Sequence, residues 1–248
     1  MTFNLTFNPA FLLVALTLTS AAFSAQAQDS SPDEEKLSFK FTPTYLSSSD
    51  GNHALDLNLR GVLGAHTAWI GRYSDKAGYV QARTGYENRQ DFGFVRTVLS
   101  LQLAAGGFVG GAVSAELGGE SYVITGWGRT NLQKYYNLNF DPNDAITLGI
   151  GTRLLPQTEL SIYQIRDDRL GTGQRVTHAV ARYKASESKR WTVDVSRKSG
   201  TTDTANQVQG YGLAVTYDFG NYFARLARDP YANFTDASQT RISLGMRF

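Results

Sequence analysis

The sequence predicts an all-β fold, a closed antiparallel up-and-down transmembrane β-barrel of about 12 to 14 strands, with 14 favoured. Three observations support this prediction. Segments with apolar residues at every second position follow one another from residue 36 to the last residue. The connections between these segments sort by length onto two sides. The composition is rich in Gly (24), Tyr (13) and Phe (14), while the mean hydropathy is negative, which disfavours a bundle of membrane helices.

Residues 1–27 are predicted to be an export signal. An apolar core occupies residues 11–16, and Ala25-Gln26-Ala27 fits the small-x-small cleavage rule. No Lys or Arg precedes the core. A retained membrane anchor is disfavoured, because the apolar run is far shorter than the roughly 20 residues of a spanning helix. Residues 28–35 are polar and acidic and are predicted to form a flexible lead, and residues 36–248 are predicted to form the barrel.

The N-terminal half contains about seven expected strands. They cover residues 37–45, 55–73 with a tight turn at 63–66, 79–86, 95–103, 109–117 and 122–129. Pro43 lacks an amide hydrogen, so weak pairing or a bulge is expected there. Residues 88–91 are expected to form a turn. If two of these N-terminal segments merge or lie outside the barrel, the strand number falls to 12.

The C-terminal half is organised in the same way. Its expected strands cover residues 146–154, 160–166, 176–183, 191–195, 211–217, 222–226 and 240–248. Counting back from Phe248, one side receives the short connections 156–157, 186–189 and 218–221. The other side receives the longer connections 130–144, 167–174, 199–207 and 229–238. Short turns on one side and long loops on the other are typical of transmembrane β-barrels, whereas a soluble β-sandwich has no reason to sort its loops in this way.

The last nine residues form the most regular of these segments. Ile242, Leu244, Met246 and Phe248 share one face, and Arg241, Ser243, Gly245 and Arg247 share the other. This segment resembles the closing strand of Gram-negative outer-membrane β-barrels, which end in an aromatic residue after alternating apolar residues. The resemblance implies the cell outer membrane as location, with membrane lipid and lipopolysaccharide as surroundings. It also implies that the barrel-insertion machinery recognises the four apolar residues. An ordinary edge strand that ends in Phe is the alternative for this motif taken alone.

Charged residues concentrate on the face opposite to the apolar one, which we expect to line the lumen. These lumen-facing candidates are Lys40, Arg60, Arg96, Glu116, Arg153, Asp194, Arg225, Arg241 and Arg247, together with Asp56. So many charges require water or partners. One interpretation is a charge-paired network that blocks the lumen of a structural or adhesive barrel. We favour the other, a narrow porin-like channel for small polar or anionic solutes, because Arg and Lys favour anions and no inserted plug is expected from connections this short.

Other chemistry is weakly supported by the sequence. Outer-membrane lipid-modifying enzymes that resemble this class use a His with a Ser two residues further on, which His53, His66 and His178 all lack. A lipid- or peptide-modifying enzyme therefore stays a lesser hypothesis, and no catalytic residue is assigned. Residues 141–144 (Asp-Pro-Asn-Asp) offer oxygen ligands that suit Ca²⁺, but a turn is the simpler interpretation. No Cys is present, and no metal, cofactor or nucleic-acid partner is expected.

Aromatic residues near the expected strand ends are predicted to form girdles at the two membrane surfaces. They are Trp69, Tyr73, Trp127, Trp191, Tyr211, Tyr217, Phe219 and Tyr222. Tyr135, Tyr136, Tyr231 and Phe234 lie in long connections. A girdle position is preferred for them over a role in contacting a sugar or receptor outside the cell.

Overall fold

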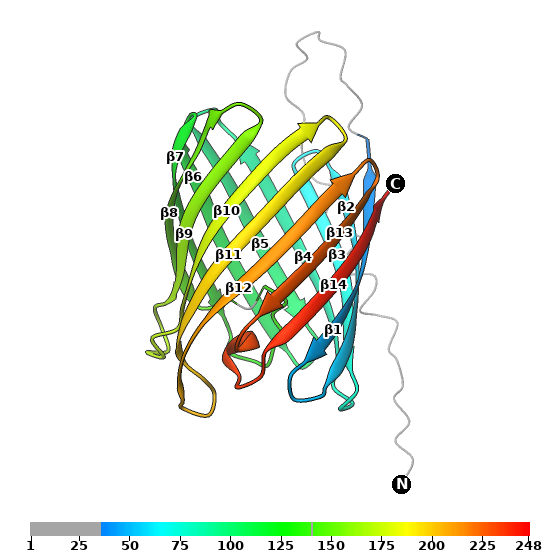
Figure 1. Ribbon diagram of the computed structural model, residues 1–248, viewed down its shortest axis with the longest axis vertical. Coiled ribbons are helices and arrows are strands. Elements are labelled where there is room, and N and C mark those ends of the chain that lie inside the picture. Colours follow the sequence, from blue (N-terminus) through cyan, green and yellow to red (C-terminus); the bar gives the residue numbers. More distant parts are fainter. Residues whose placement is uncertain (1–35, 140) are drawn as a thin grey trace, which may run out of the picture. The chain divides into compact units, whose positions relative to one another are not determined.

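The computed structural model of the chain describes residues 36–139 and 141–248, so the predicted export signal and flexible lead lie outside the described residues. Within this range, fourteen strands form one closed antiparallel barrel, in which neighbours in the chain pair and β1 pairs with β14 (Figure 1). The prediction of a 14-stranded up-and-down barrel is confirmed. The strands are β1 (Ser38–Ser48), β2 (His53–Leu63), β3 (His66–Asp75), β4 (Val80–Asp91), β5 (Val95–Ala104), β6 (Phe108–Gly118), β7 (Ser121–Thr130), β8 (Ala145–Leu155), β9 (Thr158–Asp167), β10 (Arg175–Ser186), β11 (Lys189–Thr201), β12 (Gln207–Phe219), β13 (Tyr222–Asp229) and β14 (Gln239–Arg247), with a 3₁₀ turn, η2 (Ala232–Phe234), before β14.

The barrel closes between β1 and the C-terminal strand β14. The Phe39 amide donates to the Phe248 carbonyl at 2.7 Å, and the Phe248 amide donates back at 3.0 Å. The two rings stack with centroids 5.7 Å apart. Pairing of β1 with β14 passes from Phe41 to Thr44 without a register shift, while pairing with β2 continues through Pro43. The missing amide hydrogen of Pro43 therefore weakens one ladder and causes no bulge.

The connections sort by length clearly in the C-terminal half of the chain, and less so in the N-terminal half, where connections 92–94 and 105–107 are equally long. One end of the barrel carries the short turns 64–65, 92–94, 119–120, 156–157, 187–188 and 220–221. The other end carries the connections 49–52, 76–79, 105–107, 131–144, 168–174, 202–206 and 230–238. We call these the short-turn end and the long-loop end. Residues 88–91 differ from the prediction, because they continue β4 and the turn follows them at 92–94.

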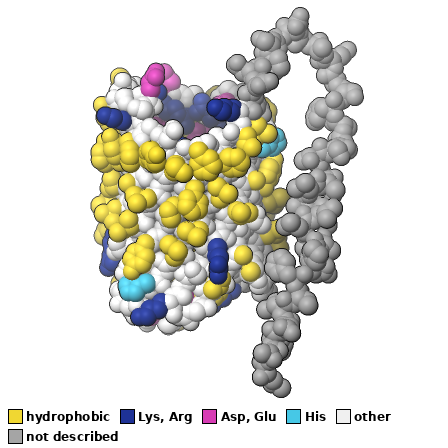
Figure 2. All heavy atoms as spheres, turned by 90° about the vertical axis from the view of Figure 1, so that its right-hand side faces the viewer, with side chains coloured by type: hydrophobic (Ala, Val, Ile, Leu, Met, Phe, Trp, Pro, Cys, Tyr) yellow, Lys and Arg dark blue, Asp and Glu magenta, His cyan; other side chains and the backbone are white. Residues whose placement is uncertain are grey.

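The outer face of the barrel is apolar, because successive side chains of a strand point to opposite faces. On β5, the outward residues Leu99, Leu101 and Leu103 are 54%, 62% and 52% exposed. Figure 2 shows such side chains spread across the face of the barrel that is in view. An apolar surface of this extent would be unfavourable in water and matches the lipid-facing surface of a membrane barrel. No helix among the described residues is long and apolar enough to cross a membrane.

Two of the predicted girdle residues lie inside the barrel. Trp69 and Tyr73 are only 8% and 2% exposed, because His66, Ala68 and Ile70 take the outward positions of β3. The Trp69 ring covers the backbone of Gly85 on β4, where an added Cβ would lie 2.5 Å from the indole. The girdle prediction is wrong for these two residues. Trp127, Trp191, Tyr211, Phe219 and Tyr222 are exposed on the outer face, as predicted, and Tyr217 stacks on Trp191 at 4.3 Å.

Candidate functional site

The interior of the barrel holds a cavity of about 580 Å³. Strand residues from most of the inner wall line it, together with residues of the β7–β8 connection. Figure 2 shows the hollow at the short-turn end of the barrel, with Lys and Arg side chains inside it. The cavity is therefore the candidate site for any solute that enters the barrel.

The β7–β8 connection, described at residues 131–139 and 141–144, folds into the barrel, and we call these residues the strap. In a closed barrel of fourteen strands, β7 and β14 are seven strands apart in either direction and thus face each other. Nevertheless, Arg241 of β14 donates a hydrogen bond to the Leu138 carbonyl of the strap. The strap therefore crosses the full width of the lumen.

The first half of the strap is held by β3 and β4. The Gln81 side chain donates to the Lys134 carbonyl at 2.9 Å and accepts from the Tyr136 amide at 3.0 Å. The Tyr136 ring stacks on Tyr73 with centroids 3.8 Å apart. Arg83 donates to the Tyr136 carbonyl at 3.0 Å and forms an ion pair with Asp56 on β2. These contacts satisfy backbone groups that would otherwise be unpaired inside the barrel.

The Asp56–Arg83 ion pair crosses over β3, which lies between β2 and β4 in the sheet. Gly71 of β3 lies between the two strands, and a Cβ there would be 3.5 Å from the Arg83 guanidinium and 3.2 Å from the Asn58 amide. Both members of the pair are nearly inaccessible, with side chains 2% exposed. Removing one member would leave a buried charge without its counter-ion, which is costly.

The second half of the strap is held by His178 on β10. Its Nε2 lies 3.1 Å from an Asp141 carboxylate oxygen of the strap, and its Nδ1 lies 3.0 Å from Asp194 on β11. Both ring nitrogens can donate at once only in the imidazolium form. The ring thus links two carboxylates and stacks on Tyr163 at 4.9 Å. It connects the strap to the wall.

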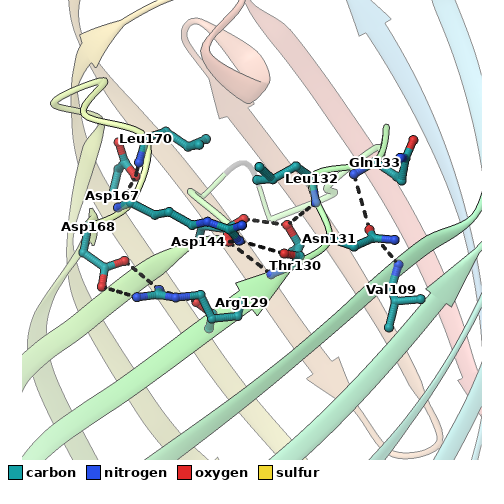
Figure 3. Close-up of polar contacts among 12 residues, drawn as sticks. Val109, Arg129, Thr130, Asn131, Leu132, Gln133, Asp144, Asp167, Asp168 and Leu170 are labelled. Atoms are coloured by element: carbon teal, nitrogen blue, oxygen red, sulfur yellow. Dashed lines mark hydrogen bonds and ion pairs between the residues drawn. The ribbon is translucent and has the colours of Figure 1, made fainter.

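At the long-loop end, hydrogen bonds join the last residue of the strap to the last residue of β7 (Figure 3). Asp144 accepts from the Thr130 amide at 3.1 Å and the Thr130 hydroxyl at 2.5 Å. Arg169 donates to both Asp144 and the Thr130 carbonyl at 2.8 Å. Asp144 therefore ties the end of the connection back to the end of β7 and to Arg169. Nearby, Arg129 donates two hydrogen bonds to Asp168 at 2.7 and 2.6 Å.

The pKa of the Asp168 carboxyl is held below its ordinary value, chiefly by the hydrogen bonds from Arg129. A lowered pKa means that this tether contributes stability above the ordinary aspartate pKa and loses it only as the pH falls through the lowered value. The loop of residues 168–174 therefore keeps its tether to β7 in mildly acid solution.

The strap corrects two expectations from the sequence. No inserted plug was expected, yet Tyr135 and residues 137–139 and 141–143 of the strap line the cavity inside the barrel. Tyr135 and Tyr136 were expected at a membrane surface or outside the cell, yet both stack within the lumen, Tyr135 on Phe108 at 4.2 Å and Tyr136 on Tyr73. The sequence did contain one feature that indicates an inward fold. The connection after residue 130 was the longest polar one and contained two adjacent aromatic residues.

The residues expected to face the lumen are distributed among several settings. Lys40, Arg60, Arg225 and Arg241 line the cavity. Arg153 pairs with Glu116 at 2.6 Å, and Arg96 lies 3.7 Å from the same carboxylate. Arg247 pairs with Asp218, and Asp194 with His178. Arg83 and Glu87 also face the lumen but were not predicted from the sequence. The alternation of β4 indicated this orientation, because Val80, Ala82 and Tyr86 occupy the outward positions.

Two cations of the cavity stand apart from these networks. Neither Lys40 nor Arg225 has a carboxylate within 4.0 Å in the part of the chain that the structure describes. The Lys40 ammonium lies 4.2 Å from the centre of the Phe223 ring. The buried Nε of Arg225 has no hydrogen-bond partner among the described residues. These two groups are available to an anionic solute.

The other histidines lie on the outer face. His53 contacts the Tyr45 hydroxyl at 3.0 Å, and His66 contacts the Tyr86 hydroxyl at 2.5 Å. In residues 36–139 and 141–248, no Ser or Thr hydroxyl is hydrogen-bonded to a histidine, and no group of three or more His, Asp or Glu side chains is arranged to hold a metal ion. The geometry thus does not assemble a nucleophile with a base.

Replacing Asp141 by Ala should loosen the second half of the strap. A hydrogen bond to a charged group contributes about 1.5–3 kcal/mol, so amide exchange in residues 137–143 should accelerate roughly tenfold or more. Hydrogen–deuterium exchange with mass spectrometry measures this effect. Asp203→Ala, in the exposed 202–206 loop, serves as the control. Equal exchange in wild type and Asp141→Ala would show that His178 does not hold the strap.

The fold has counterparts among solved structures. No protein-family model and no curated protein matches the sequence. The outer membrane protein Omp33 of Acinetobacter baumannii superposes with a TM-score of 0.53 at 10% identity, over 87% of this chain and 100% of that one. A variant of the Rhodopseudomonas blastica porin (TM-score 0.47, 10% identity, 86% and 99%) and Pseudomonas aeruginosa OccK5 (0.45, 8%, 86% and 97%) are more distant. At such identities, the likeness to Omp33 shows a shared β-barrel fold.

Proposed function

We propose that the protein is a narrow channel of the cell outer membrane that passes small polar solutes, with a preference for anions. The observation that carries this proposal is the pair of unneutralised cations, Lys40 and Arg225, on the wall of a water-accessible cavity. The apolar outer band and the fold shared with an outer-membrane protein support the location.

The charge balance of the cavity supports the preference for anions. Five basic residues with inward-facing side chains line it (Lys40, Arg60, Arg83, Arg225 and Arg241), against three acidic ones (Asp56, Glu87 and Asp141). Some of these charges cancel in ion pairs, such as Arg60 with Glu87 at 3.3 Å. The remaining positive charge raises the local concentration of anions in a confined, low-dielectric space.

The strap supports the proposal that only small polar solutes pass through the lumen. Because it crosses the lumen, a solute must pass between the strap and the wall. On the cavity side the strap presents Asn137, Asn139 and Asn143, whose amides can donate and accept hydrogen bonds. The wall adds hydroxyl groups, including those of Thr42, Thr44 and Ser243. Such a lining can replace part of the hydration of a small polar anion.

Replacing both Lys40 and Arg225 by Gln should shift selectivity toward cations. In planar bilayers with a salt gradient, we expect the anion-to-cation permeability ratio from the reversal potential to fall by about twofold or more, because the fixed positive charge of the wall is lost. The matched control is Arg72→Gln, which removes an exposed, outward-facing cation of β3. An unchanged ratio in the double variant would refute the selectivity mechanism, and wild-type protein without discrete conductance would refute the channel itself.

A further inference from the structure

The outer face of the barrel carries a second group of cations that solute passage does not use. Arg166 on β9, Arg175 on β10 and Arg197 on β11 are exposed and point outward near the long-loop end. We call these three residues the arginine patch. Arg166 and Arg175 are directly opposite each other in the ladder, and Arg197 is opposite Thr177, two residues along from Arg175.

The arginine patch has no internal counter-charge. Among the described residues, no carboxylate lies within 4.0 Å of any of the three guanidinium groups. The Arg175 side chain is oriented by a hydrogen bond from its Nε to the Ser199 hydroxyl at 2.9 Å. Like charges placed directly opposite each other on a sheet repel. An external anion that contacts all three groups would remove this repulsion.

An apolar groove leads away from the arginine patch toward the middle of the membrane band. On β10 the outward residues after Arg175 are small: Thr177, Ala179 and Ala181. Larger side chains flank them, with Ile162 and Leu160 on β9 and Val195 and Val193 on β11. The groove is part of an open hollow of about 730 Å³ that continues across β8 and β7 to Leu117 on β6. A second hollow of about 390 Å³, lined by Gln164 and Thr177, lies between it and the patch.

We infer that β9–β11 form a binding site for a phosphorylated lipid of the outer leaflet, of the chemical class of lipid A. Its phosphate groups contact Arg166, Arg175 and Arg197, because guanidinium groups match phosphate oxygens with paired hydrogen bonds. An acyl chain lies in the groove along β10, where residues 177–181 alone rise about 13 Å. Charge at one end and an apolar groove beneath it fit an amphiphile better than a free anion.

The position of the site agrees with this ligand. The long-loop end is the outer end of an outer-membrane barrel, so the arginine patch lies at the level of the outer-leaflet headgroups. The proposed lipid site is on the outer surface only. Lipid binding there does not depend on whether the lumen conducts solutes.

The test measures binding of diphosphoryl lipid A to the full-length protein in neutral detergent, by native mass spectrometry. The triple variant Arg166→Gln, Arg175→Gln, Arg197→Gln should bind it roughly tenfold or more weakly. Arg72→Gln is the matched control, because Arg72 is likewise exposed, outward-facing and without a carboxylate within 4.0 Å among the described residues, but lies seven strands away on β3. It should bind as wild type does. Heat-dependent gel mobility verifies that each barrel is folded.

Two further measurements separate lipid from other anions. Ala179→Leu, which fills the groove without changing charge, should weaken lipid A binding several-fold. Inorganic phosphate at the same concentration should leave the melting temperature unchanged while lipid A raises it. Wild-type binding by the triple variant, equal loss in Arg72→Gln, or equal stabilisation by inorganic phosphate would each overturn the lipid site. Burial of β9–β11 against a second copy in bilayers, seen by crosslinking, would overturn it as well.

Discussion

Replacing residues 132–142 of the strap by a short Gly–Ser linker is expected to raise single-channel conductance several-fold. The strap crosses the whole lumen and carries the side chains that narrow it, whereas the Thr130–Asp144 contact at its base is retained in this variant. The open cross-section then approaches that of the bare 14-stranded wall, whose width follows from its strand number. Planar-bilayer recording measures the change directly.

A comparable replacement of residues 203–205 is the control for this prediction. That loop lies at the same end of the barrel, and its described contacts are to the neighbouring 230–238 loop, such as the Asp203 amide with the Phe234 carbonyl at 3.1 Å. Its shortening should leave conductance unchanged. Equal conductance of the strap variant and wild type would mean that solutes do not pass beside the strap.

Asp56→Ala is expected to lower the free energy of unfolding by about 3–5 kcal/mol, the usual cost of breaking a buried ion pair from one side. Arg83 would then keep its charge at a site where its side chain is 2% exposed, with its hydrogen bond to the Tyr136 carbonyl but without its counter-ion. Urea unfolding in lipid vesicles, followed by tryptophan fluorescence, measures the loss.

Arg89→Gln provides the comparison for Asp56→Ala. It also removes an ion pair, with Glu87 at 3.4 Å, but the Arg89 side chain is 64% exposed. Exposed pairs contribute about 0–1 kcal/mol, so this variant should unfold nearly as wild type does. Similar losses in both variants would show that the Asp56–Arg83 pair is hydrated and not part of a buried core.

The direction of individual side chains was predictable because it is a local property of a strand. All nine expected lumen residues stand on the inward parity of their strands, from Lys40 on β1 to Arg247 on β14. The prediction was wrong for Trp69 and Tyr73, because it placed them in the outer girdle on their aromatic character and not on their position in the alternation. Following the His66, Ala68 and Ile70 parity would have placed both inside.

Contacts between distant strands were not predictable from the sequence. Asp56 and Arg83 meet across β3, from strands β2 and β4 that do not pair with each other, and His178 meets Asp141 because the strap turns back from β14 to β10. The difference between Arg225 and Arg241 is of the same kind. Both are inward arginines of neighbouring strands, yet Arg241 holds the strap and Asp229 at 2.7 Å, while Arg225 has no carboxylate within 4.0 Å among the described residues.

The barrel fold, the two faces of each strand and the sorting of the C-terminal loops were predictable from the sequence, with a strand number between 12 and 14. These properties follow from a two-residue period and from turn residues, which act over a few neighbouring positions. The inward fold of the strap and the identity of the unpaired cations depend instead on contacts between distant strands. A connection enters the lumen when its backbone groups find partners there, and those partners come from β3, β4, β10 and β14, whose approach to the strap depends on closure of the whole barrel.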